Sequence, residues 1–89
     1  GTIKIAMSTA QTGALAEAGV SQVNAAQMAI NEINEAGGIN GQQLELVVYD
    51  DKGDVTESTL VAQRIVQDPE FLCVIGTLTS STTLATLPI

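Results

Sequence analysis

The stretch AINEINEAGGINGQQLELVVYDD, residues 29–51, decides the fold because it places a helix end, a turn and a strand in immediate succession. The helix that ends here has an apolar face formed by Val23, Ala26, Ile30 and Ile33. Spacing of three to four residues is typical of an amphipathic helix. Gly37 stands where such a helix needs a left-handed residue to release its last carbonyls. The pattern therefore predicts a helix that ends at Gly37.

A tight turn and a strand are predicted directly after this helix. Gly38, Asn40 and Gly41 are residue types that readily adopt the backbone conformations of turns. Leu44 to Tyr49 is nearly continuous apolar sequence, which is typical of a strand covered on both faces. We therefore expect a buried strand that ends at the acidic pair of residues 50–51.

Strands and helices alternate along the whole chain. The predicted strands are Ile3 to Met7, Leu44 to Asp50 and Phe71 to Ile75, and the predicted helices run from about Leu15 to Ala36, from Asp54 to before Pro69, and from Ser80 onward. This order implies parallel strands joined by right-handed crossovers. By analogy with doubly wound folds, we expect an α/β protein of three layers with strand order 2-1-3. At 89 residues, the chain is one domain at most.

The second helix carries a start signal and a stop signal. Asp54 and Glu57 have the spacing of a capping box, in which Asp54 accepts from the first-turn amides and Glu57 reaches back. Val61 and Ile65 lie four residues apart and predict an apolar face. Pro69 cannot continue a helix, so the helix ends before it.

Composition excludes several function classes. The chain is 45% hydrophobic and 15% charged, which is a globular profile. Its formal net charge is −7, and its three cations, Lys4, Lys52 and Arg64, are scattered. They form no basic stripe, so we expect no nucleic-acid partner and no binding to an anionic membrane surface.

Chemistry-bearing residues are equally sparse. Cys73 is the only cysteine and lies in an apolar run, so we expect a buried and inert thiol. The chain has no histidine and no nucleophile–base spacing, so we expect neither an enzyme nor a metal or other cofactor. It begins at Gly1 without an initiator Met, which fits a processed protein whose export signal has been removed.

The exits of the first and third strands are the candidate site. In order 2-1-3, the loops Ser8–Gly13 and Thr77–Thr83 are neighbours at the point where an open parallel sheet binds its ligands. Both loops are rich in hydroxyls and free of formal charge. Ser80 and Ser81 combine hydroxyls with the free amides of a helix start, which attract an anion such as a carboxylate. The alternative is that Ser80 only caps its helix, and the spacing leaves both open.

Three other kinds of site would use residues elsewhere in the chain. Asp50 and Asp51 suggest a phospho-receiver domain, but such a domain needs a further aspartate where this chain has Gly76 and Thr77. Residues 50–54 lack the ligand spacing of a calcium loop, so a solvated loop with a helix cap is the better interpretation. The glycine-rich turn follows a helix rather than opening one, which argues against a phosphate-binding loop.

Several motifs in fixed order resemble the type I periplasmic binding proteins, especially the branched-chain amino-acid binders. The motifs are Ile3-Lys4-Ile5-Ala6, Gln11-Thr12-Gly13, Gly37-Gly38-Ile39-Asn40-Gly41, Leu44-Glu45-Leu46, Tyr49-Asp50-Asp51 and Val74 to Thr83. The resemblance covers essentially all 89 residues. Gly53 and Thr79 stand where many relatives pair cysteines, and Ala18 stands where some carry an aromatic that covers the ligand.

The resemblance implies a binding protein rather than a catalyst. Ser80 inherits binding of the ligand's α-carboxylate, and the other implied ligand-binding residues are Thr79, Ser81, Thr77 and Gln11. The ligand would be a small amino acid of branched-chain type or a related carboxylate, held between two lobes. The protein would serve an ABC importer and its membrane permease, in the periplasm or elsewhere outside the cytoplasm, lipid-anchored if Gram-positive. Residues 1–89 would be part of the N-terminal lobe, a single incomplete domain.

Two alternative functions and one hazard remain. The same fold serves as a ligand-sensing domain in receptors and in regulators of amide or amino-acid uptake, and a fused kinase or channel would favour that interpretation. A flavodoxin-like fragment without a working site is the structural alternative. The third predicted strand leaves an uncovered apolar edge, which predicts self-association or pairing with another chain.

Overall fold

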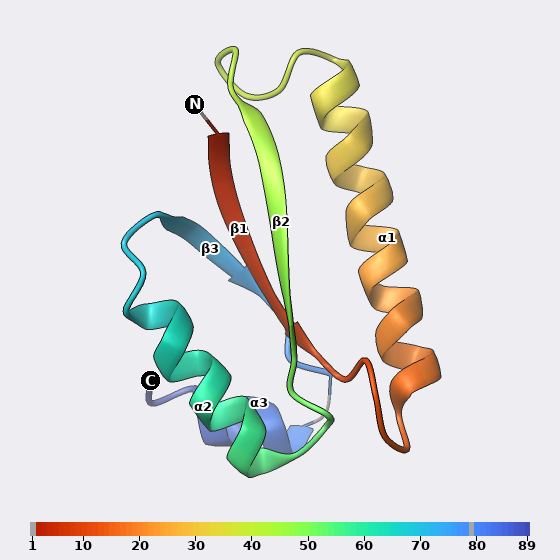
Figure 1. The fold of residues 1–89 in the computed structure, drawn as a ribbon, viewed down its shortest axis with the longest axis vertical. Helices are drawn as coiled ribbons and strands as arrows, with labels where there is room; N and C mark the ends of the chain where they lie inside the picture. The colour runs from red at the N-terminus through yellow and green to blue at the C-terminus, as the bar shows by residue number, and fades with distance from the viewer. Residues whose placement is uncertain (1, 79) are drawn as a thin grey trace.

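The computed structural model describes residues 2–78 and 80–89. The elements in chain order are β1 (Thr2–Thr9), α1 (Ala16–Glu35), β2 (Gln43–Asp50), α2 (Val55–Val66), β3 (Phe71–Ile75) and α3 (Ser80–Thr86). The three strands are parallel and form one sheet in the order β2-β1-β3, which confirms the predicted topology. α1 covers one face of the sheet, and α2 and α3 lie together on the other side (Figure 1). The fold is therefore the predicted three-layer α/β arrangement.

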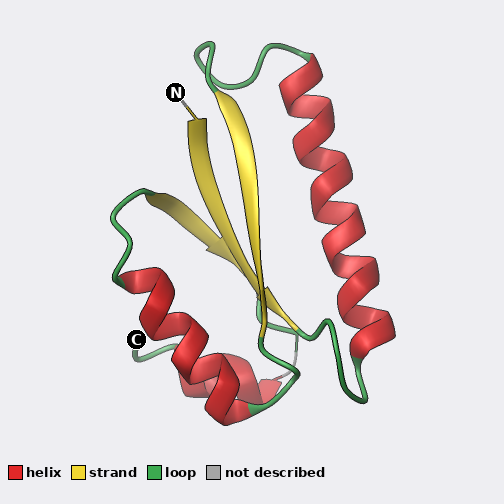
Figure 2. Cartoon of the chain, viewed as in Figure 1, coloured by secondary structure: helices red, strands yellow, loops and turns green. Residues whose placement is uncertain are grey.

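The central strand β1 carries the core. Ala6 and Met7 are both fully buried, and as neighbours in a strand they point to opposite faces of the sheet. Ala6 packs with Val61 and Ile65 of α2, so the predicted apolar face of that helix is the one that meets the sheet. Figure 2 shows β1 between the other two strands, with helices on both sides.

α1 ends as the sequence predicts. Gly37 has a φ of 107°, in the left-handed region that glycine adopts without strain. Its N–H donates to the Asn34 carbonyl at 3.1 Å, and the N–H of Gly38 donates to the Ile33 carbonyl at 2.9 Å. These two bonds form a Schellman motif, which satisfies carbonyls that the helix end would otherwise leave unpaired.

The turn into β2 is a two-residue hairpin. Ile39 and Gln42 exchange backbone hydrogen bonds of 2.8 and 2.9 Å. Between them, Asn40 and Gly41 have φ values of 52° and 78°. Positive φ at both central residues defines the turn type for which Asn-Gly is the preferred sequence.

α2 begins at a side-chain cap, although the capping box is incomplete. An Asp54 carboxylate oxygen accepts from the Glu57 backbone N–H at 3.0 Å, as predicted. The return bond expected from the Glu57 side chain is replaced, because the backbone N–H of Asp54 donates to the Asp51 carbonyl at 2.9 Å. The turn that leaves β2 therefore supplies the second half of the cap.

The face of α1 that meets the sheet differs by one residue from the prediction. Ile30 is buried, but Ile33 is 38% exposed. Asn34, four residues after Ile30, takes the inward position, and its side-chain amide bonds the N–H and the carbonyl of Leu44 at 2.7 and 3.0 Å. A polar side chain that satisfies the start of β2 therefore replaces an apolar one in this layer.

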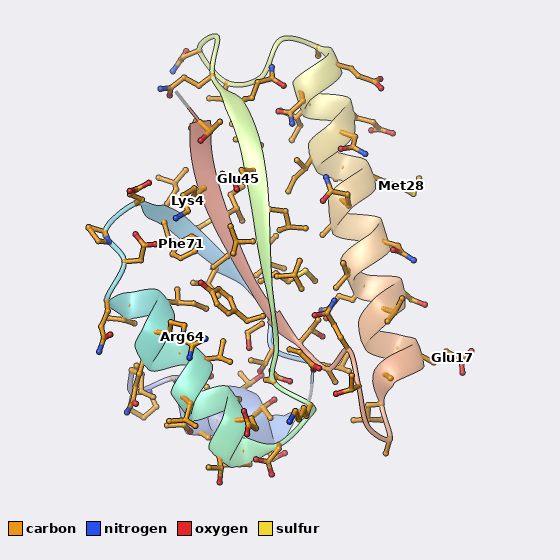
Figure 3. All side chains as sticks on the ribbon, in the orientation of Figure 1. Lys4, Glu17, Met28, Glu45, Arg64 and Phe71 are labelled. Carbon is orange, nitrogen blue, oxygen red and sulfur yellow. The ribbon has the colours of Figure 1, made fainter. Side chains whose placement is uncertain are left out.

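The outer face of α1 is exposed. Met28 is 64% exposed, and Figure 3 shows Met28 and Glu17 pointing away from the sheet.

Within residues 2–78 and 80–89, no helix combines the length and the apolar character that a bilayer span requires.

β3 is much less covered than predicted. Leu72 and Val74 are 68% and 52% exposed, and the thiol-bearing residue Cys73 is exposed as well. The expectation of a buried thiol was therefore wrong. The reason is topological: β3 is an edge strand, and α1 packs on β2 and β1. β2 is only partly covered too, since most of its residues after Leu44 are half-buried.

Candidate functional site

The exits of β1 and β3 meet, as strand order 2-1-3 predicts. Gly76 follows β3 with a φ of 134°, in the region that favours glycine. A Cβ on Gly76 would lie 2.1 Å from the Ser8 carbonyl oxygen, a distance that real side chains do not reach. Gly76 therefore permits the close approach that brings the two loops to one edge of the sheet.

A cavity of about 260 Å³ adjoins the exits of β1 and β3 and lies between β3, α2 and α3. Ser8, Thr77 and Thr83 form its polar part, and residues of α2 and of the C-terminal segment form apolar walls. Small-molecule pockets are typically roughly 300–1,000 Å³. This cavity is smaller, and most of its lining comes from the helical layer rather than from the strand exits.

The structure describes some, but not all, of the predicted ligand-binding residues at the β3 exit. The Thr77 hydroxyl lies 2.6 Å from the Thr83 hydroxyl, so it ties the loop to α3. Ser80 is the first residue of α3, and Ser81 has an exposed side chain in the first turn. The prediction for Thr79 lies outside the described residues, as does the Ser80 side chain. The described positions, Thr77, Ser80 and Ser81, thus belong to the loop after β3 and to the start of α3.

Gln11 is the predicted ligand-binding residue of the β1 exit, and its backbone is hydrogen-bonded to Asp50, the last residue of β2. Its backbone N–H donates to Asp50 Oδ1 at 2.8 Å. The Thr12 hydroxyl donates to Asp50 Oδ2 at 2.7 Å, and the Lys52 backbone N–H donates to Oδ1 at 2.9 Å. The segment after β2 is therefore bonded to the β1 exit, while Lys52 and Asp54 within it are exposed to solvent.

These bonds also affect the charge of Asp50. Desolvation, the largest single effect, favours the neutral acid, but the donors from Gln11, Thr12 and Lys52 together favour the carboxylate. The net result is a pKa of Asp50 below its ordinary value. Asp50 is therefore ionised at neutral pH.

Asp51 connects the exits of β1 and β2 from inside the protein. It is 1% exposed. Its Oδ2 accepts from the Ser8 hydroxyl at 2.9 Å, and its Oδ1 accepts from the Gly53 N–H at 2.9 Å. The Asp51 N–H donates to the Thr9 carbonyl at 3.0 Å, which extends the strand pairing by one residue. Both oxygens of this buried side chain thus have donors within the chain.

α1 holds the β1 exit from the opposite face. The Thr9 hydroxyl donates to the Gln22 side-chain oxygen, and Thr9 is fully buried. Sequence reasoning placed Ser8 in the candidate site but missed Asp50 and Gln22 as parts of this framework. For Asp50 a signal was available, because order 2-1-3 makes the β2 exit a neighbour of the β1 exit.

The described residues contain no group of three or more acidic, histidine or cysteine side chains arranged to hold a metal ion. Donors of the protein itself occupy the oxygens of Asp50 and Asp51. The arrangement is a hydroxyl-rich edge next to the start of α3, in which the hydroxyls of Ser8, Thr9 and Thr12 donate within the protein.

Known proteins share both the sequence and the fold. A periplasmic binding protein family model matches residues 2–89. The leucine-, isoleucine-, valine-, threonine- and alanine-binding protein of Pseudomonas aeruginosa is 46% identical over 85 residues, which is 96% of this chain and 23% of that protein. The Leu/Ile/Val-binding protein of Escherichia coli K12 is 40% identical over 81 residues, which is 91% of this chain and 22% of that protein.

Solved structures of binding proteins have the same fold over this length of chain. The branched-chain amino acid transporter substrate-binding protein of Streptococcus pneumoniae, in complex with isoleucine, matches with a TM-score of 0.92 and 38% identity over 99% of this chain and 25% of that one. The leucine-binding protein of Thermotoga maritima matches with a TM-score of 0.84 and 29% identity over 98% of this chain and 24% of that one. The chain thus spans about a quarter of these relatives' length. With its strand order, its strand-exit motifs and this likeness over nearly every residue, the chain belongs to the type I periplasmic binding protein family.

Proposed function

We propose that residues 1–89 form the first part of the N-terminal lobe of a solute-binding protein that serves an ABC importer. The observation that carries this proposal is the 46% identity, over 96% of the chain, to a protein named for binding leucine, isoleucine, valine, threonine and alanine. Its ligand is accordingly a small aliphatic amino acid, with branched-chain amino acids first. The function is binding, not catalysis.

The geometry suggests how the ligand is held. Its carboxylate meets the hydroxyls and amides at the start of α3, with Ser80 in the main role and Thr79, Ser81 and Thr77 beside it. Gln11 approaches from the β1 exit. Asp50 and Asp51 lie behind that exit, where their carboxylates accept hydrogen bonds from Gln11 and Ser8 of the protein itself. A second lobe completes the contacts, and the ligand selects the closed arrangement because it touches both lobes.

This function sets the partner and the location. A membrane permease receives the closed, loaded protein. The protein works outside the cytoplasm, in the periplasm or, in a Gram-positive source, on a lipid anchor. Binding of the amino acid requires no cofactor.

Calorimetric titration of the intact natural protein tests the proposal. We expect leucine, isoleucine or valine to bind and leucinamide, which lacks the carboxylate, to bind far more weakly. Failure of all these amino acids to bind would contradict the proposed ligand class. Equal binding of leucine and leucinamide would contradict the carboxylate role and would favour an amide sensor.

The Ser80→Ala variant tests the site itself. Loss of a hydrogen bond to a charged group costs about 1.5–3 kcal/mol, so leucine affinity should fall by that amount. Thr2→Ala is the matched control, because it removes an exposed hydroxyl at the far end of β1. Unchanged affinity in Ser80→Ala would leave Ser80 as a helix cap only.

A further inference from the structure

The carboxylate of Asp50 is the point where the segment Gln11–Thr12 is attached to the sheet. Asp50 is the last residue of β2 and pairs with Thr9, the last residue of β1. Its backbone therefore has a fixed position beside the β1 exit. From there the side chain reaches the next two residues of the loop, Gln11 at 2.8 Å and Thr12 at 2.7 Å.

The residues before this segment are held in other ways. Thr9 is bonded through its carbonyl to the Asp51 N–H and through its hydroxyl to Gln22. Ala10 is fully buried against α1. In contrast, the hydrogen bonds described for Gln11 and Thr12 end on Asp50. The conformation of the loop just beyond the buried exit thus depends on one side chain of the neighbouring strand.

We propose that Asp50 is a positioning residue of the amino-acid site, which holds Gln11–Thr12 in the conformation that the ligand meets. The inference rests on the proposed function and deepens it. Asp50 does not touch the ligand. It acts through Gln11, whose backbone it bonds and whose side chain is a predicted part of the site.

Geometry rather than charge carries this role. Oδ1 accepts two backbone N–H groups, from Gln11 and Lys52, and Oδ2 accepts the Thr12 hydroxyl. An asparagine can reproduce this pattern, because its amide oxygen accepts both N–H groups and its NH₂ can donate to the Thr12 oxygen. An alanine reproduces none of it. The two substitutions remove the same charge, but only asparagine keeps the side-chain size and the hydrogen-bonding groups.

Titration calorimetry of the intact natural protein with leucine compares Asp50→Ala and Asp50→Asn. We expect Asp50→Ala to weaken binding about tenfold, which corresponds to a loop that is competent in roughly one-tenth of the molecules. Asp50→Asn should stay within about threefold of the unmodified protein, since it restores the bonds. Thr12→Val removes one of the bonds and should lie between the two.

Asp54→Ala is the matched control. It removes a carboxylate four residues further along and weakens the α2 cap, but no bond of the β1 exit depends on it. We expect its leucine affinity to be unchanged even though it lowers the melting temperature. Loss of affinity that follows melting temperature in all variants would overturn the positioning role, as would equal losses in Asp50→Ala and Asp50→Asn.

Hydrogen exchange at the Gln11 amide separates this inference from the proposed function. Asp50→Ala should raise the exchange rate of that amide selectively, and Asp50→Asn should not. If the unmodified protein binds no amino acid, the proposed function fails. If it binds and Asp50→Ala frees the Gln11 amide without loss of affinity, only the positioning role is overturned.

Discussion

Gly19 in the first turn of α1 lies directly against the carbonyl of Ala10, so that a Cβ on Gly19 would be 1.4 Å from the carbonyl oxygen. Both residues are buried. The absence of one side chain therefore sets the distance between α1 and the β1 exit. The same contact packs the helix against the residue just before the loop of Gln11.

Gly19→Ala should displace α1. Its neighbour is backbone rather than a flexible side chain, so the strain cannot relax locally, and overpacking costs about 1–3 kcal/mol or more. Gly41→Ala is the control, since nothing lies within 4 Å of its added Cβ and only the strain of its φ of 78° applies. Chemical denaturation of the intact natural protein should show the larger loss of stability for Gly19→Ala. A loss no larger than that of Gly41→Ala would contradict the packing argument.

Asp54→Ala should destabilise the protein by about 1 kcal/mol, because the Glu57 N–H loses its side-chain acceptor at the start of α2. Asp54→Asn keeps an acceptor in place and should stay close to the unmodified protein. Thermal melts of both variants check this. Equal losses in the two would show that the charge at the helix start matters more than the hydrogen bond.

The pH dependence of stability should reveal the ion pair of Lys4 and Asp68, whose Nζ and Oδ2 atoms are 3.0 Å apart and which joins β1 to the turn between α2 and β3. The Glu70 backbone N–H, and after it Lys4, hold the pKa of Asp68 below its ordinary value. A carboxyl with a lowered pKa stabilises the fold above its unfolded pKa, about 3.9, and this contribution disappears as pH falls through the folded value.

Lys4 gives the opposite dependence at high pH. Its hydrogen bond to Asp68 outweighs desolvation and raises the pKa of Lys4, so its contribution is present below the unfolded value of about 10.4 and disappears as pH rises through the folded pKa. Lys4 also lies 4.6 Å from the centre of the Phe71 ring, and Figure 3 shows the two side by side.

The Lys4→Met variant tests the loss of this stabilisation at both low pH and high pH. Its melting temperature should fall below that of the unmodified protein at neutral pH, and the difference should shrink in strong acid and in strong base. Lys52→Met, which removes an exposed lysine, is the charge-matched control and should show a smaller difference. A difference that stays constant across pH would mean that the ion pair does not stabilise this end of the sheet.

The isolated chain of residues 1–89 should self-associate. β3 is an edge strand with Leu72 68% exposed and Val74 52% exposed, and such edges pair with other chains. Leu72→Lys should shift sedimentation toward the monomer. Met28→Lys places the same charge on an exposed apolar residue of α1 and should not. A monomer at high concentration that binds leucine at micromolar levels would contradict both this prediction and the need for a second lobe.

Most of the fold could be predicted because its signals are local. The glycine at the end of α1, the Asn40–Gly41 turn and the Asp54 cap each depend on a few adjacent residues, and the structure has all three. Burial could not be predicted in the same way. Cys73 and Ile33 are apolar residues in regular elements, yet whether they are covered depends on which element packs over them.

The candidate site was predictable in outline only. Topology placed the exits of β1 and β3 together, because parallel strands end at one edge. For Asp50, the strand order predicted its place beside the β1 exit but not its hydrogen-bond partners, and the contact of Gln22 with Thr9 has no sequence pattern. The ligand role of Ser80 remains a prediction, for which the Ser80→Ala titration is the measurement.

The order of the sheet also governs how the chain folds. Ala6 of the central strand pairs with Val47 and with Val74, so no strand has its partner nearby in the sequence. A long loop must close before either pairing forms, and proteins dominated by such contacts fold slowly. β1 is synthesised first and must wait until both partners exist. The delay keeps the new chain unfolded for longer than a sheet built from hairpins, in which each strand meets its partner as soon as the next one is made.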